Sequence, residues 1–514
     1  MPTTLAFKEI IDLPQWRPAS PAPAADAAAV CMAYDMRNNE RNIPGNFRLR
    51  SATVLESYNA VNDDWVPLGS PALTGTFGAG AACVFHPSQG PRGTLAAGAT
   101  TTQVVLSTAL PAAVGINQLA NDGSGAGYWI RIIGNAAGSS GKTESRRIVA
   151  NTAGTTPTIT LNEALTFTPA SGDAYEIRSG RLFMLSAGTL AAGVWKHYDV
   201  ATNSYSGNLA TTNLPGTIGG DSVLVALSEA HMPNNQQTAG NGYFGQITAS
   251  ASSSTSITAA TGVLPAALAA DEYRNFQIRI IEDTTTPTAV GQRRRISGHG
   301  AGATAAFTVA AWAVTPSPTA KFVVENDDDK IILFTNQTSV YNYNITANTW
   351  DTTTWATAIA RGTGTWAAHA FGIDHTVDVA RRSRHSHIFV GRGGASNAID
   401  VLDIAGAPTG SWANDIAYGN KSQTFTTGTC AAYDPVTNGG RYAYMQVNGT
   451  QRFGRFDVQN RTWEPWGYQR YTAGTAVVGQ KLHMAFFVDG STRLAFLYGV
   501  RQSNVEQFSI ACHR

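Results

Sequence analysis

Residues 343–350 read Tyr343-Asn344-Ile345-Thr346-Ala347-Asn348-Thr349-Trp350 and carry the signals of a β-hairpin. An aromatic residue is followed by asparagine, an apolar residue, a few turn-forming residues and a second aromatic. The asparagine side chain can close the turn by bonding to the backbone a few residues further on. We therefore interpret this pattern, which we call the hairpin box, as a strand that ends in Asp or Asn, followed by a strand that opens with a packed aromatic residue.

The hairpin box recurs along the chain. Further copies lie at 58–65, 198–205, 402–412 and 456–463, and one of them has the aliphatic Leu402 in place of the first aromatic. The five copies start 140, 145, 59 and 54 residues apart. The two shorter spacings fit propeller blades of roughly 50 residues, whereas the two longer ones exceed that length by about 90 residues. The excess predicts two insertions.

The two insertions resemble each other. Tyr128-Trp129-Ile130-Arg131-Ile132-Ile133 aligns with Phe276-Gln277-Ile278-Arg279-Ile280-Ile281 at an offset of 148 residues. At the same offset, Arg146-Arg147-Ile148 falls on Arg294-Arg295-Ile296. One offset that holds over separate segments indicates a duplicated small β domain, so the second copy should repeat the strand order of the first.

Short apolar or alternating runs bounded by Gly, Asn, Asp, Pro and Thr are found throughout the chain, and no long window has helical periodicity. We therefore predict an all-β fold, a β-propeller of about six blades with two homologous inserted β domains. The predicted parts are an extended N-terminal arm at 1–27, the propeller at 28–90, 181–247 and 326–514, the first inserted β domain at 91–180 and the second at 248–325. Because a ring of sheets must close, strands near 29–34 should lie close to strands near 507–512.

The amino-acid composition argues against several classes of function. Only 14% of the 514 residues are charged, against roughly 25% in an average soluble domain. The net charge of +1 argues against a general nucleic-acid binder, which would carry a basic excess. No apolar run reaches the length of about 18 residues that spans a membrane. The first residues lack the basic and apolar segments of a secretory signal, so we expect synthesis in a reducing cytoplasm.

Two features resemble known families. The glycine doublets at 219–220, 393–394 and 439–440, followed by a closing Trp or Tyr, resemble degenerate kelch repeats. The opening of the first insertion, from Thr100 to Ala113, resembles the add-on β domains of tailed-phage virion proteins. A kelch-like propeller that carries such domains resembles the tail nozzle of short-tailed phages, the tail tubular protein B class.

This resemblance implies a structural virion protein rather than an enzyme. It implies a nozzle subunit that forms a homohexameric ring around the DNA exit channel, with adaptor and fibre proteins as neighbours. Genomic DNA would pass through without sequence-specific binding. The subunit would be made in the host cytoplasm and located in the virion tail, and the resemblance implies no catalytic residue, cofactor or metal.

Two arginine clusters are candidates for the subunit interface. Their members are Arg381, Arg382 and Arg384 in one cluster and Arg293, Arg294 and Arg295 in the other. The functional interpretation is docking onto an acidic neighbouring subunit. The alternatives are contact with DNA phosphates and a solvated hairpin edge whose charge blocks aggregation between sheets.

Two groups have residue types that can bind metal ions. His385 and His387 lie on the same face of a strand and could share a metal. Asp327-Asp328-Asp329 could offer oxygen ligands to Ca²⁺. We favour a solvated or interface position for the histidines and a solvated turn for the carboxylates.

A different function is that of a non-catalytic adsorption or decoration protein of the virion that binds host glycans. Sugars stack on flat apolar rings, so exposed aromatics at the tips of the insertions would favour this hypothesis. Tyr128 and Trp129 lie within an Ile-rich strand, and we expect them in the core instead.

Overall fold

The computed structural model describes most of the chain. The described residues are 16–18, 31–34, 46–50, 53–59, 64–69, 73–75, 77–110, 114–120, 127–134, 139, 142–190, 194–227, 247–261, 264, 268, 270–271, 273–274, 276–325, 329–335, 338–351, 360–371, 386–403, 411–416, 424–434, 441–447, 453–458, 460–466, 481–489, 492–501 and 504–509. Strands dominate these residues, and their helical segments are short 3-10 turns, Gln118–Ala120 and Pro287–Ala289. The prediction of an all-β fold is confirmed.

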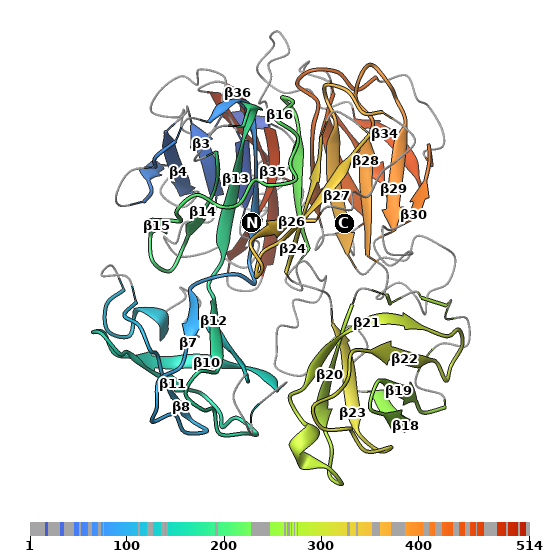
Figure 1. Cartoon of the computed structure of the whole chain (residues 1–514). Coiled ribbons are helices and arrows are strands. Elements are labelled where there is room, and N and C mark those ends of the chain that lie inside the picture. Colours follow the sequence, from blue (N-terminus) through green and yellow to red (C-terminus); the bar gives the residue numbers. More distant parts are fainter. Residues whose placement is uncertain are drawn as a thin grey trace, which may run out of the picture.

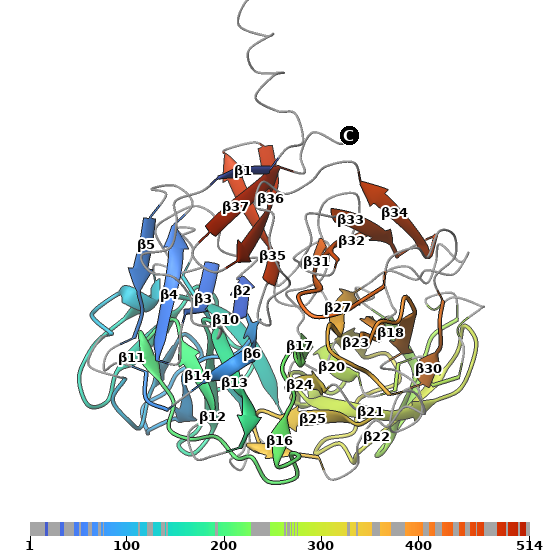
Figure 2. The same cartoon turned by 90° about the horizontal axis from the view of Figure 1, so that it is seen from above.

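The described strands form six antiparallel sheets around a common centre (Figure 2). From the innermost strand outward they are β2 (Cys31–Tyr34), β3 (Asn46–Arg50), β4 (Val54–Asn59), β5 (Asp64–Pro67); β6 (Gly78–His86), β13 (Arg181–Thr189), β14 (Trp195–Asp199), β15 (Ser204–Tyr205); β17 (Val223–Leu227), β24 (Lys330–Phe334), β25 (Val340–Asn344), β26 (Thr349–Trp350); β27 (Trp366–Phe371), β28 (Ser386–Gly391), β29 (Ile399–Asp403), β30 (Ser411–Ala413); β31 (Cys430–Asp434), β32 (Tyr442–Gln446), β33 (Phe453–Asp457), β34 (Thr462–Trp466); and β35 (Lys481–Asp489), β36 (Thr492–Arg501), β37 (Asn504–Ser509), β1 (Trp16–Pro18). In the second sheet, β16 (Thr217–Ile218) also pairs with the end of β13. The innermost strands contact one another in cyclic order, which is the arrangement of a β-propeller.

The two ends of the chain close the ring. β1 pairs with β37, with Trp16 opposite Phe508, so the start of the chain completes the sixth sheet. The innermost strand of that sheet, β35, contacts β2 of the first sheet. The strand expected beside β2, near 507–512, is β37, which lies in the same sheet as β35 but pairs with β1 and β36. Residues 16–18 therefore form a strand where the sequence predicted part of an extended arm, because the outer edge of β37 offers unpaired backbone groups to a partner. The rest of 1–27 lies outside the described residues.

The hairpin boxes close their turns as predicted. In three boxes the Asp or Asn side chain accepts a hydrogen bond from the backbone N–H three residues on: Thr202 to Asp199 (3.4 Å), Ala347 to Asn344 (2.8 Å) and Asn460 to Asp457 (2.9 Å). The two aromatic ends of a box are cross-strand neighbours, as for Tyr343 and Trp350, whose ring centroids lie 5.0 Å apart. The box thus fixes both the turn and the register of the outer hairpin.

The hairpin box of the third sheet also forms hydrogen bonds to Ala210, in the segment that connects the second sheet to the third. Asn348 lies in the left-handed region at φ 52°, a conformation that asparagine tolerates. Its side-chain oxygen accepts bonds from the Tyr343 hydroxyl (2.7 Å) and from the backbone N–H of Ala210 (3.0 Å). The Trp350 indole donates to the carbonyl of the same Ala210 (3.0 Å). Neighbouring sheets are therefore joined by hydrogen bonds as well as by apolar packing.

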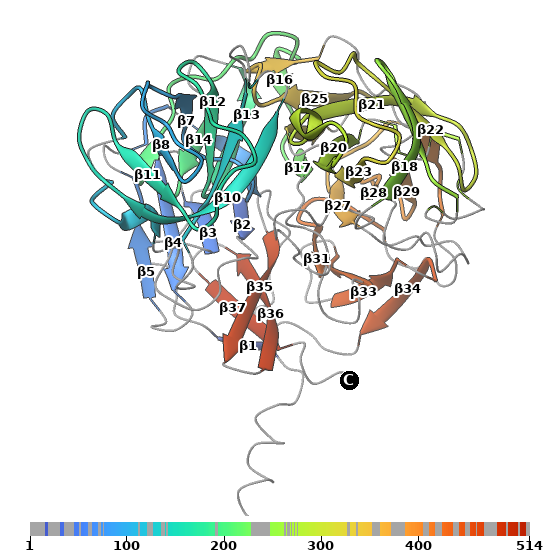
Figure 3. The same ribbon diagram turned by 90° about the horizontal axis from the view of Figure 1, so that it is seen from below.

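Two further units of six strands, here called the first and second module, lie at one end of the propeller (Figure 1). The first module is β7 (Arg92–Thr94), β8 (Gln103–Val105), β9 (Trp129–Ile133), β10 (Thr143–Asn151), β11 (Thr158–Leu161) and β12 (Ala174–Arg178). The second module is β18 (Ile247–Ser253), β19 (Ser256–Ala259), β20 (Gln277–Glu282), β21 (Arg293–His299), β22 (Ala306–Val309) and β23 (Lys321–Glu325). Seen from below, the modules lie side by side (Figure 3).

The two modules have the same strand order. The first is ordered β7-β12-β9-β10-β11-β8, and the second is a closed barrel in the order β18-β23-β20-β21-β22-β19. β10 carries a bulge between Ile148 and Ala150, and β21 carries one between Ile296 and Gly298, at the offset that aligns the sequences. A bulge is a specific local feature, so its repetition supports a common origin of the modules.

The modules contact each other through equivalent segments. The Thr143 N–H donates to the carbonyl of Gly291, and Lys142 forms an antiparallel bridge with Gln292. Thr143 and Gly291 are themselves equivalent at the offset of 148 residues. An antiparallel contact between equivalent positions is the pattern of a local two-fold axis, so each module presents the same edge to the other.

Replacing Gly291 with valine should separate the modules. Gly291 has a φ of 88°, and a Cβ there would lie 3.2 Å from Cβ of Lys142 and 3.4 Å from the Thr143 nitrogen. Loss of the contact should speed amide exchange at Thr143, 148 positions away, by about tenfold or more. Gly172→Val is the matched control, because Gly172 has a φ of 91° and no heavy atom within 4 Å of the added Cβ. Equal exchange at Thr143 in both variants would contradict the prediction.

Candidate functional site at the junction of propeller and first module

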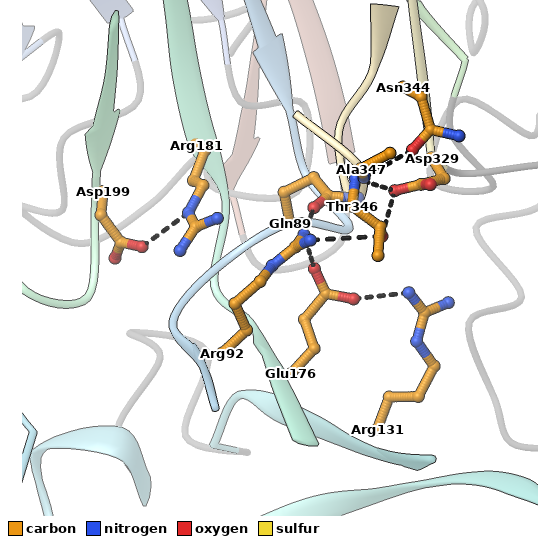
Figure 4. A network of polar contacts seen from close by, with 10 residues as sticks. All are labelled: Gln89, Arg92, Arg131, Glu176, Arg181, Asp199, Asp329, Asn344, Thr346 and Ala347. Carbon is orange, nitrogen blue, oxygen red and sulfur yellow. Dashed lines mark hydrogen bonds and ion pairs between the residues drawn. The ribbon is translucent and has the colours of Figure 1, made fainter. Parts of the chain in front are cut away.

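A cluster of charged and polar side chains lies where the first module joins the propeller (Figure 4). The chain leaves β6, passes through Gln89 and Arg92 into the module, and returns through β12 to Arg181 at the start of β13. Exit and return are adjacent because β6 and β13 pair with each other. The junction cluster comprises Gln89, Arg92, Arg131, Glu176, Arg181, Asp199, Asp329 and Thr346.

Glu176 is the centre of the cluster. Its side chain is only 5% exposed. Arg92 Nη2 donates to Oε1 (2.6 Å) and Arg131 Nη2 donates to Oε2 (2.5 Å), so each carboxylate oxygen binds one guanidinium. Arg92 also donates to the side chain of Gln89. Charge-assisted bonds of this kind are stronger than neutral ones, and here they join the entry, the interior and the exit of the module.

Arg92 extends the cluster to the third sheet. Its Nη1 donates to Thr346 Oγ1 (3.2 Å), within the hairpin box of that sheet. Thr346 in turn donates to Asp329 Oδ1 from its backbone nitrogen (2.9 Å) and its hydroxyl (2.6 Å). Asp329 directly precedes β24, where the chain has returned from the second module. One chain of polar contacts therefore connects the base of the first module with the sheet that carries the second.

A buried ion pair flanks the cluster. Arg181 Nε donates to Asp199 Oδ2 (2.9 Å), across the register that places the two residues opposite each other. Burial raises the pKa of Asp199 and lowers the pKa of Arg181, and in each case the partner's charge opposes the shift. Burial also holds the pKa of His197 well below its usual value, and the charges of Arg181 and Arg92 lower it further. The imidazole is therefore uncharged at neutral pH.

Two carboxylates of the cluster, those of Glu176 and Asp199, are held by arginines. Within the described residues, no group of three His, Cys, Asp or Glu side chains could hold a metal ion. Asp329 accepts bonds from Thr346, and Asp327 and Asp328 lie outside the described residues. None of the helices in the described part of the chain is long and apolar enough to cross a membrane.

The predicted interface arginines fall into two groups. Arg293, Arg294 and Arg295 lie on β21 of the second module, and Arg295 is exposed. Arg294 packs over the Trp312 ring (5.7 Å) and donates to the Ala311 carbonyl (3.0 Å), so it serves its own module. Burial lowers its pKa.

The equivalent residue of the first module makes the same contact. Arg146 Nε donates to the Ala164 carbonyl (3.1 Å), just as Arg294 does to Ala311. Arg381, Arg382 and Arg384 lie outside the described residues, as does His385. The role of either arginine cluster at a subunit interface stays a prediction.

The sequence reasoning missed the junction cluster. One signal was available: Arg181 begins a strand whose hairpin box contains Asp199, and the cross-strand register follows from the box. Arg441 and Asp457 repeat this pairing in the fifth sheet, with Nη2 2.5 Å from Oδ2. The contacts of Arg92, Arg131 and Glu176 depend on how the module docks, so no local pattern could reveal them.

Comparisons with known proteins find distant structural similarities and no family. Neither a protein-family model nor a curated protein sequence matches the chain. Among solved structures, a chain of the mitotic checkpoint complex is 8% identical, with 96% of this chain and 91% of that chain covered and a TM-score of 0.32. The β-propeller domain of Cps50 (Swd1) from Myceliophteria thermophila is 8% identical, with 82% and 100% covered and a TM-score of 0.28. A Bacteroides thetaiotaomicron protein of unknown function is 9% identical, with 91% and 83% covered and a TM-score of 0.29.

Proposed function

We propose that the chain is a structural virion protein, the tail nozzle subunit of a short-tailed phage. In this proposal six kelch-like blades form the propeller, and the two modules are copies of one β domain inserted into it. Six subunits form a ring around the DNA exit channel, with adaptor and fibre proteins as neighbours, and the genome passes through without sequence-specific contact. The protein is located in the virion tail after synthesis in the host cytoplasm, and it has no catalytic role.

The arrangement of the modules carries this proposal. Both lie at one end of the propeller, contact each other through equivalent segments, and the first is anchored by the buried junction cluster. Two modules that contact each other and are fixed to the propeller suit a subunit that must stay rigid within an assembly. Identical subunits that meet through such modules form heterologous interfaces, which close into a ring when the rotation allows.

The glycan-binding alternative has less support. A stacking platform for sugars needs exposed flat rings. Among the side chains whose exposure the structure describes, the large hydrophobic ones that are exposed are Val66, Ile116 and Val149, and none of these is aromatic. Trp129, which was expected in the core, is half-buried, and the guanidinium of Arg147 covers its ring at 5.1 Å. The rings of the modules are thus engaged within the modules themselves.

The proposal is tested by the mass of the assembled protein. We expect native mass spectrometry and electron microscopy of the full chain, and of tails from the virion, to give a closed ring of subunits. Replacing residues 248–325 with a short Gly-Ser linker should abolish the ring while the propeller still unfolds cooperatively. A strict monomer in the virion, or a ring that survives the replacement with the first module exposed, would refute the proposal.

A further inference from the structure

One position that is apolar in three sheets is an arginine in the fourth. The residue five positions before the innermost strand is Leu73 in the second sheet, Ile218 in the third and Phe425 in the fifth. All three are buried. The fourth sheet has Arg361 at this position, five residues before the start of β27. The equivalent positions of the other three sheets are thus part of the apolar core.

The guanidinium of Arg361 is buried without a hydrogen-bond partner. The residue is 3% exposed, and its Nε and both Nη atoms have no hydrogen-bond partner in the described structure. Two aromatic rings are its close neighbours, Phe334 of β24 at 5.7 Å and Trp412 of β30 at 4.5 Å. Stacking on aromatic faces attracts the cation but leaves its N–H groups unbonded. A buried donor without an acceptor destabilises the fold.

The nearby carboxylate does not neutralise Arg361. Asp400 acts on it through its charge, but both carboxylate oxygens already accept bonds from Arg392, Nε to Oδ2 at 2.9 Å and Nη2 to Oδ1 at 2.7 Å. Burial lowers the pKa of Arg361 to about 10, so the group is still charged at neutral pH. The N–H donors of Arg361 therefore stay unused between the third and fourth sheets.

We propose that Arg361 binds a small free oxyanion of the phosphate type between the third and fourth sheets. The planar guanidinium offers parallel N–H donors that match two oxygens of such an anion, and the anion supplies the acceptors that these donors lack. The low exposure of Arg361 restricts the ligand to a small free anion, because a phosphate within a polymer could not enter. This site is separate from the proposed ring contacts and does not depend on them.

Equilibrium dialysis of the full chain with labelled inorganic phosphate tests the site. We expect the wild-type chain to bind phosphate at one site that the Arg361→Leu variant lacks. Leucine is chosen because Leu73 occupies the equivalent position in the second sheet. Arg361→Lys retains the positive charge but loses the planar pair of N–H donors, so it should bind phosphate about tenfold more weakly. A single-stranded oligonucleotide should not displace the phosphate. In thermal unfolding at constant ionic strength, phosphate should raise the Tm of the wild type and leave that of Arg361→Leu unchanged.

The control variant is Arg455→Leu, which removes an arginine that is paired with Glu464. This variant should bind phosphate as the wild type does. Wild-type protein that binds no phosphate, equal binding or equal Tm shifts in Arg361→Leu, or displacement by the oligonucleotide would each overturn the proposal. If Arg361→Leu does not fold, the phosphate affinities of the wild type and of Arg361→Lys are compared instead. Equal affinities would overturn the proposal.

Discussion

Replacing Glu176 with alanine is expected to lower the free energy of unfolding by about 3–5 kcal/mol, because it leaves Arg92 and Arg131 without the carboxylate that they share. Glu176 and Arg131 have side chains that are 5% and 8% exposed, so water cannot replace the lost acceptor. The loss should appear as a lower urea midpoint in chemical denaturation. Glu176→Gln, which keeps the shape and one acceptor oxygen, should lie between the wild type and the alanine variant.

Glu464→Ala is the matched control for this experiment. Glu464 also pairs with an arginine, Arg455, at 2.7 Å, but its side chain is 35% exposed. Ion pairs that water can reach contribute about 0–1 kcal/mol, so this variant should unfold close to the wild type. Similar losses of unfolding free energy in Glu176→Ala and Glu464→Ala would show that burial does not determine how much the junction cluster contributes to stability.

The junction cluster also explains how a small module can be held firmly on a propeller. Two chain crossings alone would form a hinge. The bonds from Glu176 to Arg92 and Arg131, and from Arg92 onward to Thr346, add connections away from the crossings. Movement of the first module would have to break buried charge-assisted bonds, so a rigid attachment is the lower-energy arrangement.

Much of the fold could be predicted because its signals are local or repeated. The hairpin box contains its own turn chemistry, and the structure places the Asn344 oxygen 2.8 Å from the Ala347 nitrogen, as the sequence predicted. The offset of 148 residues between the insertions matches the strand order and the bulge of the two modules. Both patterns depend only on neighbouring or duplicated residues.

Contacts between distant elements could not be predicted in this way. Arg294 has the sequence context of an exposed basic cluster, yet it packs over Trp312 because β21 and the following segment meet in the module. Trp16 lies in a proline-rich segment that looks extended, yet it pairs with Phe508 at the other end of the chain. Only ring closure, a global property, provides a partner for that strand.

Replacing Trp350 with alanine is expected to destabilise the propeller by about 3–5 kcal/mol, since it removes the largest side chain of a hairpin box from the core. Trp350 is 1% exposed, and its ring centroid lies 5.4 Å from that of Trp195 in the neighbouring sheet. Its indole also donates to Ala210, so the variant loses a bond between the second and third sheets. Trp350→Phe would retain part of the packing without the donor and should lose less.

Trp65→Ala tests whether the loss of stability in Trp350→Ala comes from the position of the tryptophan in the hairpin box or from the burial of its side chain. Trp65 closes the box of the first sheet opposite Tyr58, but it is only half-buried, and Arg48 lies over its ring at 5.0 Å. We expect a loss of about 1–2 kcal/mol, measured by denaturant unfolding under the same conditions. A loss at Trp65 as large as that at Trp350 would mean that the outer hairpins, rather than the packing between neighbouring sheets, limit the stability of the ring.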